Sequence, residues 1–273
     1  MTAIISLTTD FGLSDPYVAA MKGVILSINP NAAIVDISHD IRPQCIEHGA
    51  FVLAAAWPYF PAGAIHVAVV DPGVGTSRAA IVLSTPKGTF LGPDNGILSA
   101  ALPDEARPAS TEGPRRASLP AGHSARCLSD DRFHRRPVSE TFHGRDIFAP
   151  VAAHLSLGVP LEELGPHLLE VVALPAFRAV PLADGALAGR IIHVDRFGNL
   201  VSDVHADQLM SNRITAEIAG RRIAGLGRTY AESEGLVALI GSSGFLEVAL
   251  REGSAAREIR ADVGETLVVR SAL

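Results

Sequence analysis

Three aspartates each end a short apolar run, and each is followed within a few residues by glycine. They are Asp10, Asp71 and Asp195. A carboxylate at the end of a buried strand, beside a turn that lets the backbone approach a ligand, is where open α/β sheets build their sites. The pattern therefore predicts a pocket for a polar small molecule, with cations among the candidate ligands.

Asp71 begins the densest local signal in the chain, the segment Asp71-Pro72-Gly73-Val74-Gly75-Thr76-Ser77-Arg78. Its glycines could present backbone N–H groups to an anion. However, the segment lacks the Gly-Lys-Ser/Thr ending of a phosphate-binding P-loop, and a strand rather than a helix is expected to follow it. Two interpretations stay open. Asp71 either caps its own backbone in a tight turn or pairs with Arg78, which would hold the acid ionised.

Two further groups combine polar side chains with expected turns. His143 directly precedes an expected helix, where a histidine is either bonded to a backbone carbonyl or available for proton transfer. Ser242 and Ser243 stand between two expected strands, where they either form a turn or hold a carboxylate. The chain has no HExxH pair, and Cys45 and Cys127 have no CxxC partner. The sequence therefore predicts neither a metal site nor a disulfide framework.

The composition is that of a globular protein. Of the 273 residues, 48% are hydrophobic and 19% are charged, and the formal net charge is −6. An acidic chain argues against nucleic-acid binding, because phosphate recognition needs clustered Lys and Arg. No apolar stretch reaches the roughly 20 residues that span a bilayer, and no positive region precedes the first apolar run, which predicts a strand rather than a signal peptide. We expect a cytoplasmic protein that binds neither nucleic acid nor membrane.

Strand and helix signals alternate up to about residue 100, which predicts an α/β domain with a Rossmann-like, mainly parallel sheet. Residues 104–138 break this rhythm, and we expect a long loop or a poorly ordered insertion there. Short strands separated by glycine turns follow later and predict an all-β sandwich or small barrel. We expect these strands over 187–194, 213–218, 221–224, 236–240, 245–250 and 267–270. The expected organisation is an α/β domain over 1–172, a linker over 173–186 and a β-barrel domain over 187–273.

Eight segments carry a pattern that extends over nearly the whole chain. They are Thr9-Asp10-Phe11-Gly12, Lys22-Gly23, Val35-Asp36-Ile37-Ser38-His39, Asp71-Pro72-Gly73-Val74-Gly75, Asp94-Asn95-Gly96, Phe142-His143-Gly144-Arg145-Asp146-Ile147-Phe148-Ala149-Pro150, Asp195-Arg196-Phe197-Gly198-Asn199 and Gly241-Ser242-Ser243-Gly244-Phe245-Leu246-Glu247. In this order the segments resemble the S-adenosylmethionine (SAM) hydrolases (adenosine-forming), also called SAM hydroxide adenosyltransferases, which are related to the fluorinases and chlorinases. Any one segment alone would be a weak match, whereas eight in the right order make a specific one.

The resemblance implies attack of water or hydroxide on the ribose C5′ of SAM, which releases adenosine and L-methionine without a cofactor or metal. The leaving group is a neutral thioether, so orientation and desolvation of the nucleophile supply most of the acceleration. By resemblance, the catalytic set is Asp71, Arg78 and His143. The resemblance also implies a homotrimer, with each active site between the N-terminal domain of one subunit and the C-terminal domain of its neighbour.

Roles in substrate binding carry over in the same way. Asp10 matches the acid that holds the ribose hydroxyls, Asp195 matches the partner of the methionine ammonium, and Asn199 matches a contact to adenine. Tyr230 or Phe245 could stack on the base. The full expected binding set is Asp10, Asp195, Phe197, Asn199, Tyr230, Ser242, Ser243, Phe245, Glu247 and Leu250.

Two alternative functions remain open, a SAM-dependent halogenase and a non-catalytic sensor of SAM or adenosine. The halogenases of this superfamily have another residue where this chain has Asp71, and they lack its Arg78 partner, which favours water over halide as the nucleophile. Residues 107–131 match no part of the family pattern.

Overall fold

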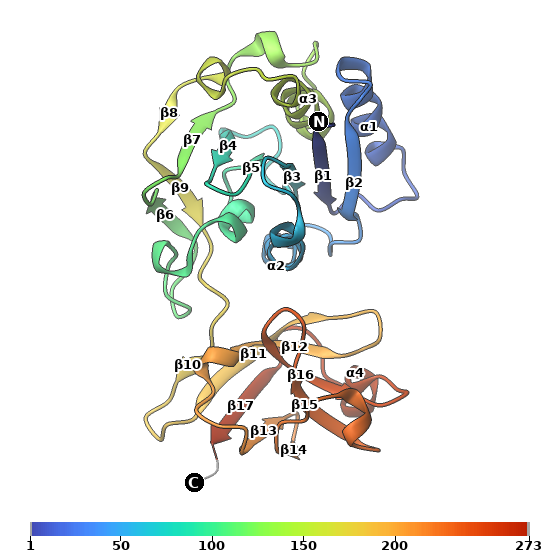
Figure 1. The fold of residues 1–273 in the computed structure, drawn as a ribbon, viewed down its shortest axis with the longest axis vertical. Coiled ribbons are helices and arrows are strands. Elements are labelled where there is room, and N and C mark those ends of the chain that lie inside the picture. The colour runs from blue at the N-terminus through green and yellow to red at the C-terminus, as the bar shows by residue number, and fades with distance from the viewer. Residues whose placement is uncertain (1, 272–273) are drawn as a thin grey trace. The chain divides into compact units, whose positions relative to one another are not determined.

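A computed structural model describes residues 2–271, and the chain forms two compact units (Figure 1). The first contains the chain up to Pro175 apart from Ala109–Thr111, and the second contains Ala109–Thr111 and the chain from Ala176 onward. Each unit has an apolar core of its own. Met1, Ala272 and Leu273, at the outer ends of the two predicted domains, lie outside the described residues.

The first unit is built on a seven-stranded mixed sheet. In sheet order its strands are β2 (Ala33–Ser38), β1 (Ile4–Thr9), β3 (Ile65–Val69), β5 (Thr89–Pro93), β4 (Ala80–Ser84), β7 (Ser124–Cys127) and β8 (His167–Leu168). The first four strands in this order are parallel, and the other three run antiparallel to their neighbours. β4 and β5 are joined by a tight turn, in which Thr85 N donates to Gly88 O at 3.0 Å, and so short a connection requires antiparallel strands. The predicted α/β class is confirmed, with antiparallel strands added beside the parallel ones.

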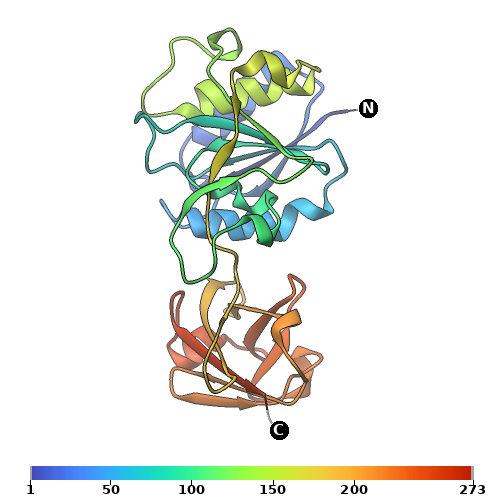
Figure 2. The same ribbon diagram turned by 90° about the vertical axis from the view of Figure 1, so that its left-hand side faces the viewer.

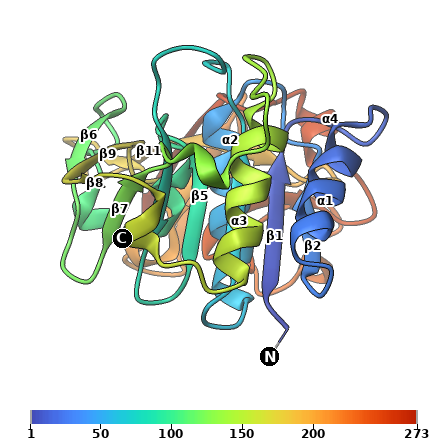
Figure 3. The ribbon, with the colours of Figure 1, turned by 90° about the horizontal axis from the view of Figure 1, so that it is seen from above.

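Helices cover both faces of this sheet (Figure 2). They are α1 (Tyr17–Ile28), α2 (Ile46–Ala56) and α3 (Ala149–Ser156). Val67 of β3 packs in one core with Met21 of α1, whereas the next residue, Ala68, packs in a second core with Leu53 of α2. Successive side chains of a strand point to opposite faces, so the apolar run in β3 is buried on both sides. α1 and α3 lie side by side next to β1 (Figure 3).

Residues 104–138 contain more structure than their sequence predicts. β6 (Arg115–Ser118) pairs antiparallel with β9 (Glu170–Ala173), and β7 pairs with β4. The expectation of a loop or a poorly ordered insertion is therefore wrong over these strands. β6 is mostly exposed and lacks an apolar alternation, so nothing local marks it as a strand. Its partner lies more than 50 residues further along the chain.

The second unit is an antiparallel, barrel-like sheet. In sheet order its strands are β14 (Arg221–Ala224), β13 (Ile214–Ile218), β17 (Thr266–Ser271), β11 (Leu187–Val194), β12 (Leu200–His205), β16 (Phe245–Leu250) and β15 (Leu236–Ile240), with β10 (Val180–Pro181) paired to β11 and a short helix, α4 (Ala255–Ile259). A bridge from Gly227 to Leu239 of β15 joins the segment after β14 to the opposite edge strand and nearly closes the sheet. The all-β prediction is confirmed. The prediction from apolar runs between glycine turns did not include β12, because the buried Ser202 and Asp203 interrupt the apolar run of this strand.

Short helical turns connect the longer elements. The 3₁₀ turns are Trp57–Tyr59, Ile97–Ala101, Asp104–Ala106, Asp131–Phe133, Leu161–Leu164, Ala206–Gln208 and Tyr230–Glu232, and Gly144–Phe148 is a single π-helical turn directly before α3. Throughout residues 2–271, no helix has the length and apolar character that crossing a membrane requires.

Candidate active site

The register of the parallel strands brings two of the three aspartates to one edge of the sheet. β1 pairs with β3 so that Thr9 lies opposite Val69. Asp10 directly follows β1, and Asp71 follows β3 after one intervening residue. Both acids therefore leave the carboxyl ends of neighbouring parallel strands, which is where open α/β sheets bind their ligands.

Arg78 joins Asp71 to His143. Its Nε donates to Asp71 Oδ1 at 2.9 Å, and its Nη2 donates to Asp71 Oδ2, so the pair is bidentate. The same Nη2 lies 2.7 Å from His143 Nδ1. Asp71 and Arg78 are nearly buried, with side-chain exposures of 5% and 11%. Of the two interpretations of the Asp71 turn, the structure shows the one in which Asp71 pairs with Arg78.

These contacts define the state of the His143 ring. An arginine side chain can only donate, so His143 Nδ1 accepts, and the proton of the neutral ring sits on Nε2. The pKa of His143 lies below its usual value because burial and then the charge of Arg78 disfavour the imidazolium, although Asp71 and Asp146 oppose this shift. His143 is therefore neutral near pH 7.

A cavity of about 400 Å³ lies in front of this cluster. Its lining residues are Asp10, Phe11, Tyr17, Pro43, Gln44, Val69, Asp71, Pro72, Val74, Thr141, Phe142, His143 and Gly144. Phe11, Tyr17 and Phe142 contact one another edge-on, with ring centroids 5.2–5.9 Å apart. The cavity thus combines a carboxylate edge with an aromatic wall, a composition suited to a ligand with polar and ring parts.

Asp10 is held in this cavity by the loop after β2. Gln44 N donates to Asp10 Oδ2 at 2.8 Å, and Gly12 N donates to His39 O at 2.8 Å. The hydroxyl of Thr9 accepts from Phe11 N at 3.3 Å. The carboxylate is therefore anchored at one oxygen by a backbone N–H while it lines the same cavity as Asp71.

The second unit has a pocket of its own, of about 840 Å³. Its lining residues are Asp195, Phe197, Asn199, Tyr230, Ala231, Ser242, Glu247, Leu250, Arg251, Glu252, Gly253, Ser254 and Arg257. Seven of the ten residues predicted to bind substrate are brought together here. Asp10 lies in the cavity of the first unit, whereas Ser243 lies outside both linings and Phe245 packs edge-on against His205 at 5.3 Å.

Two acids shape the electrostatics of the second pocket. Asp195 Oδ1 accepts from the backbone N–H groups of Phe197 and Asn199 at 2.9 and 2.8 Å, and Asp195 Oδ2 accepts from Asn199 Nδ2 at 2.9 Å. Glu247 is 7% exposed and accepts from the hydroxyl of Tyr230 at 3.3 Å. Burial, together with the charge of Asp195, raises the pKa of Glu247, although the Tyr230 hydrogen bond opposes the shift. The two acids make their side of the pocket negative, while Arg251 and Arg257 also line it.

The sequence arguments did not assign several cavity residues to the site. Phe11 and Phe142 stand inside the motif segments next to Asp10 and His143, and that adjacency is the signal that could have found them. Tyr17, Gln44 and Thr141 carry no such signal, because the fold alone brings them to the cavity. Within residues 2–271, no group of three or more His, Cys, Asp or Glu side chains is arranged to hold a metal ion.

The fold and the site together define a class of proteins. In this class a mixed α/β unit carries a polar cavity at the carboxyl edge of its parallel strands, and a barrel-like β unit with a pocket of its own follows. Residues 5–165 match the SAM hydroxide adenosyltransferase N-terminal domain, and residues 189–268 match the SAM hydroxide adenosyltransferase C-terminal domain. The chain belongs to the SAM hydroxide adenosyltransferase family.

Comparisons with individual proteins agree with this membership. The chain is 41% identical over 256 residues to the (R)-S-adenosyl-L-methionine hydrolase of Thermus thermophilus. The aligned region covers 90% of this chain and 91% of the relative. A crystal structure of a conserved, uncharacterized protein from Thermotoga maritima superposes with a TM-score of 0.83 at 32% identity, and covers 98% of this chain and all of that one. A fluorinase of Actinoplanes is more distant, at 26% identity over 76% of this chain and 73% of the relative.

Proposed function

We propose that the protein hydrolyses (R)-S-adenosyl-L-methionine to adenosine and L-methionine. The observation that carries this proposal is the contact of Arg78 with both Asp71 and His143 at the wall of a cavity that Asp10 also lines. The name of the Thermus relative supplies the substrate. Since "L" specifies the α-carbon of methionine, "(R)" designates the sulfonium sulfur.

The proposed reaction is a displacement at the ribose C5′. A lone pair of water forms the O–C5′ bond, the C5′–S bond breaks, and its electron pair returns to sulfur as the neutral thioether of methionine. The water oxygen loses one proton, which passes to solvent water. Because the leaving group is neutral, no general acid and no cofactor is required, and the task of the protein is to orient and desolvate the water.

Asp71 is the proposed acceptor for hydrogen bonds from that water. A carboxylate has about four acceptor positions, and Arg78 occupies one on each oxygen. His143 is unsuited to take the proton while its Nδ1 accepts from Arg78, because its Nε2 then carries the ring proton. We assign His143 the role of a donor that orients the water, and Asp71 that of the charge that stabilises the proton as it leaves.

The remaining groups are proposed to hold the substrate. Asp10 would bind the two ribose hydroxyls, and Asp195 would pair with the methionine ammonium. For the methionine carboxylate we propose Ser242 and Ser243. The proposed adenine contacts are Phe197, Asn199, Tyr230, Phe245, Glu247 and Leu250.

We further propose a cytoplasmic homotrimer in which the cavity of one subunit is completed by the second unit of its neighbour. Two observations support it. For the shared site, the residues expected around one substrate divide between two pockets on separate units. For the compartment, the two cysteines, Cys45 and Cys127, are free thiols, as suits a reducing environment.

The decisive experiment incubates the purified protein with the separate (R) and (S) sulfonium epimers of SAM in ¹⁸O-labelled water, with and without chloride or fluoride. We expect equal amounts of adenosine and methionine from the (R) epimer, with ¹⁸O in the 5′-hydroxyl. A 5′-halo-5′-deoxyadenosine product would identify a halogenase. Binding of either epimer without release of methionine would identify a sensor, and both outcomes would reject the proposal.

A further inference from the structure

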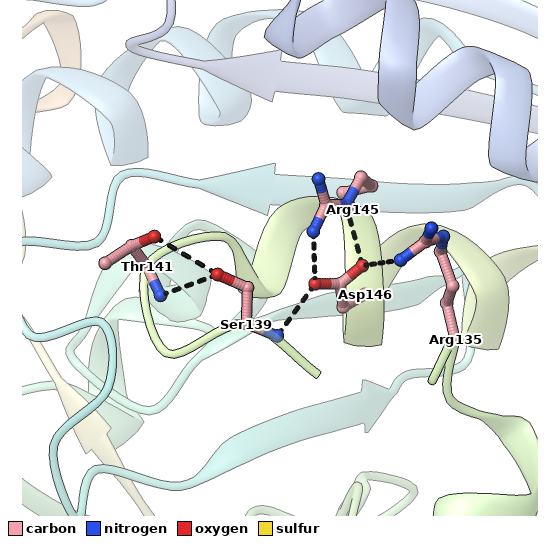
Figure 4. A network of polar contacts seen from close by, with 5 residues as sticks. All are labelled: Arg135, Ser139, Thr141, Arg145 and Asp146. Atoms are coloured by element: carbon pink, nitrogen blue, oxygen red, sulfur yellow. Dashed lines mark hydrogen bonds and ion pairs between the residues drawn. The ribbon is translucent and has the colours of Figure 1, made fainter. Parts of the chain in front are cut away.

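Asp146 is a fully buried carboxylate next to the proposed site, and the proposed reaction does not use it. Its side chain is 0% exposed and lies in the π-helical turn that begins one residue after His143. Arg145 Nε and Nη2 donate to its two oxygens at 2.7 Å, Arg135 Nη1 donates to Oδ1 at 3.2 Å, and Ser139 N donates to Oδ2 at 2.9 Å (Figure 4). A buried charge with this many donors is satisfied and ionised.

These bonds tie the segment before His143 to the turn after it. The backbone carbonyl of Asp146 accepts from Arg135 N at 2.9 Å, while its carboxylate accepts from Ser139 N. The hydroxyl of Ser139 in turn contacts the hydroxyl of Thr141 at 3.2 Å and accepts from Thr141 N at 3.3 Å (Figure 4). Thr141 lines the cavity, so a continuous chain of bonds leads from Asp146 to the cavity wall.

Arg145 extends the same network to the aromatic wall. Its guanidinium carbon lies 4.9 Å from the centre of the Phe142 ring, within the range of a cation–π contact. Phe142 lines the cavity and contacts Phe11 and Tyr17 edge-on. The bidentate pairing with Asp146 holds this guanidinium over the ring.

The segment that Asp146 holds also supports the Asp71 turn. A Cβ atom placed on Gly75 would lie 2.4 Å from the carbonyl oxygen of Glu140, so these two backbones are in direct contact. Glu140 stands between Ser139 and Thr141, which the Asp146 network holds. The position of the Asp146 carboxylate is thereby coupled to Asp71 and His143, the two side chains that Arg78 contacts.

We infer that Asp146 is a positioning residue, which holds His143, the Thr141–Phe142 wall and, through Glu140, the Asp71–Arg78 turn in their reactive arrangement. The inference rests on the proposed hydrolysis for its kinetic consequences. The influence of Asp146 on His143, one part of its geometric content, can be tested without any turnover.

The charges that face His143 make the inference measurable. They are Arg78 and His134, which lower the pKa of His143, and Asp71 and Asp146, which raise it, all against a larger lowering by burial. Removing the negative charge of Asp146 removes one of the two charges that raise the pKa of His143. The pKa of His143 should then fall further, and the low-pH limb of kcat/KM should move with it.

The test compares the wild-type chain with Asp146→Asn, which keeps the size of the side chain and removes its charge. Asp203→Asn is the matched control, because Asp203 is also a buried carboxylate that accepts a backbone N–H, from Arg190 at 2.8 Å, but lies in the second unit. The His143 titration is followed by NMR of ¹³Cε1-labelled histidine, with the resonance assigned through His143→Gln. kcat and KM are measured across the same pH range.

For Asp146→Asn we expect the pKa of His143 to fall below its wild-type value, because one of the charges that raise it is removed. We expect kcat to fall by about tenfold or more at a KM within threefold of wild type. Asp203→Asn should leave both unchanged. A His143 titration in Asp146→Asn that coincides with wild type would overturn the inference. If the wild-type chain does not hydrolyse SAM, the proposed function fails, while the titration still shows whether Asp146 acts on the His143 ring.

A second variant covers the case in which Asp146→Asn does not fold. Arg135→Gln removes one donor to Asp146 from a half-exposed position, with a side-chain exposure of 46%. We expect kcat to fall by about threefold at unchanged KM, and recovery toward wild type in Arg135→Lys. A kcat equal to wild type in Arg135→Gln would overturn the inference.

Discussion

At the level of single residues, Arg78 is the side chain on which the site depends. It forms a bidentate ion pair with Asp71 and donates to a neutral His143, so it fixes both the orientation of the carboxylate and the tautomer of the ring. A lysine could not supply this geometry, because its ammonium is a single point charge. The carboxylate and the imidazole are therefore organised before a substrate arrives, which is what orientation of a water molecule requires.

We predict that Asp71→Asn and His143→Ala each lower kcat by at least about a hundredfold, or about 2.7 kcal/mol of transition-state stabilisation. KM should change little, because neither residue holds the ribose or the methionine in the proposed complex. Steady-state assays of adenosine release measure both constants, and Asp40→Asn, at an exposed acid, is the control. A rate within threefold of wild type in either variant would remove that residue from the catalytic set.

Asp10→Ala should show the opposite kinetic pattern. Loss of the carboxylate that is proposed to bind two ribose hydroxyls removes hydrogen bonds to a charged group, each worth about 1.5–3 kcal/mol. KM and the dissociation constant of adenosine should therefore rise by at least about tenfold. Calorimetry with adenosine tests this directly, and an unchanged affinity would show that Asp10 does not hold the ribose.

His66 makes a pH-dependent contribution to stability. Its side chain is 1% exposed, stacks on Phe90 at 4.8 Å between ring centres, and lies 2.7 Å from the hydroxyl of Ser6. Burial lowers its pKa from 6.5 to about 4. Between these two pKa values His66 is mostly protonated in the unfolded chain and mostly neutral in the folded chain. The free energy of unfolding therefore falls as the pH drops from 6.5 toward 4.

We predict a loss of about 3 kcal/mol from His66 over that interval. Urea unfolding at pH 6.5 and pH 4.5, at fixed protein concentration, should show a smaller pH dependence in His66→Gln than in wild type. The exposed His167→Gln is the control. Equal pH dependence in His66→Gln and wild type would mean that His66 is already protonated in the folded protein.

At the level of elements, the turn between β3 and β4 carries two members of the proposed catalytic set. The turn starts with Asp71 and ends with Arg78, and Thr76 N donates to Gly73 O at 3.1 Å within it. Gly75 adopts a φ of +78° and touches the Glu140 carbonyl, where a side chain has no room. Glycine is needed here both for its conformation and for the close approach of two backbones.

Gly75→Ala should therefore destabilise the fold by at least about 1 kcal/mol and lower kcat by about tenfold or more, because it displaces the segment that carries His143. Gly73→Ala is a matched control in the same turn, since a Cβ there would make only ordinary contacts at 3.5 Å or more. Thermal unfolding and steady-state kinetics of the two variants give the comparison. Equal effects at both positions would show that the Glu140 contact is unimportant.

At the level of the whole molecule, the proposed substrate contacts divide between two units. The cavity of the first unit holds the proposed chemistry and the ribose site, whereas the pocket of the second unit holds Asp195 and Asn199. If each active site joins the two units of different subunits, as the family resemblance implies, two variants damaged in different units can complement one another. A head-to-tail ring of subunits would place the first unit of one subunit against the second unit of its neighbour.

We predict that co-expressed Asp71→Ala and Asp195→Ala chains form mixed oligomers that regain activity. With random assembly of equal amounts, about a quarter of the sites combine an intact first unit with an intact second unit. Each variant alone, and two separately purified variants that do not exchange subunits, should stay inactive. Absence of recovered activity in verified mixed oligomers would place both halves of the site within one chain.

The sequence by itself determined the fold class of both halves. Apolar runs that end in an acid, helical spacing in the first half, and glycine turns in the second half are local signals, and local periodicity tells which face of an element is buried. It did not predict β6 or β12, because an exposed strand and a strand with buried polar residues lack that periodicity. It also missed the antiparallel strands beside the parallel ones, since strand order is not a local property.

For the site, the resemblance of the motif segments to the family led to Asp71, Arg78 and His143 as the proposed catalytic set. Only the tertiary structure decided that they meet: Arg78 and His143 are 65 positions apart and touch at 2.7 Å. The same holds for Asp146, whose donors come from three separate positions along the chain. Contacts of this kind depend on how strands pair and loops pack, and the free energy that selects them is shared by the whole core rather than encoded in any one segment.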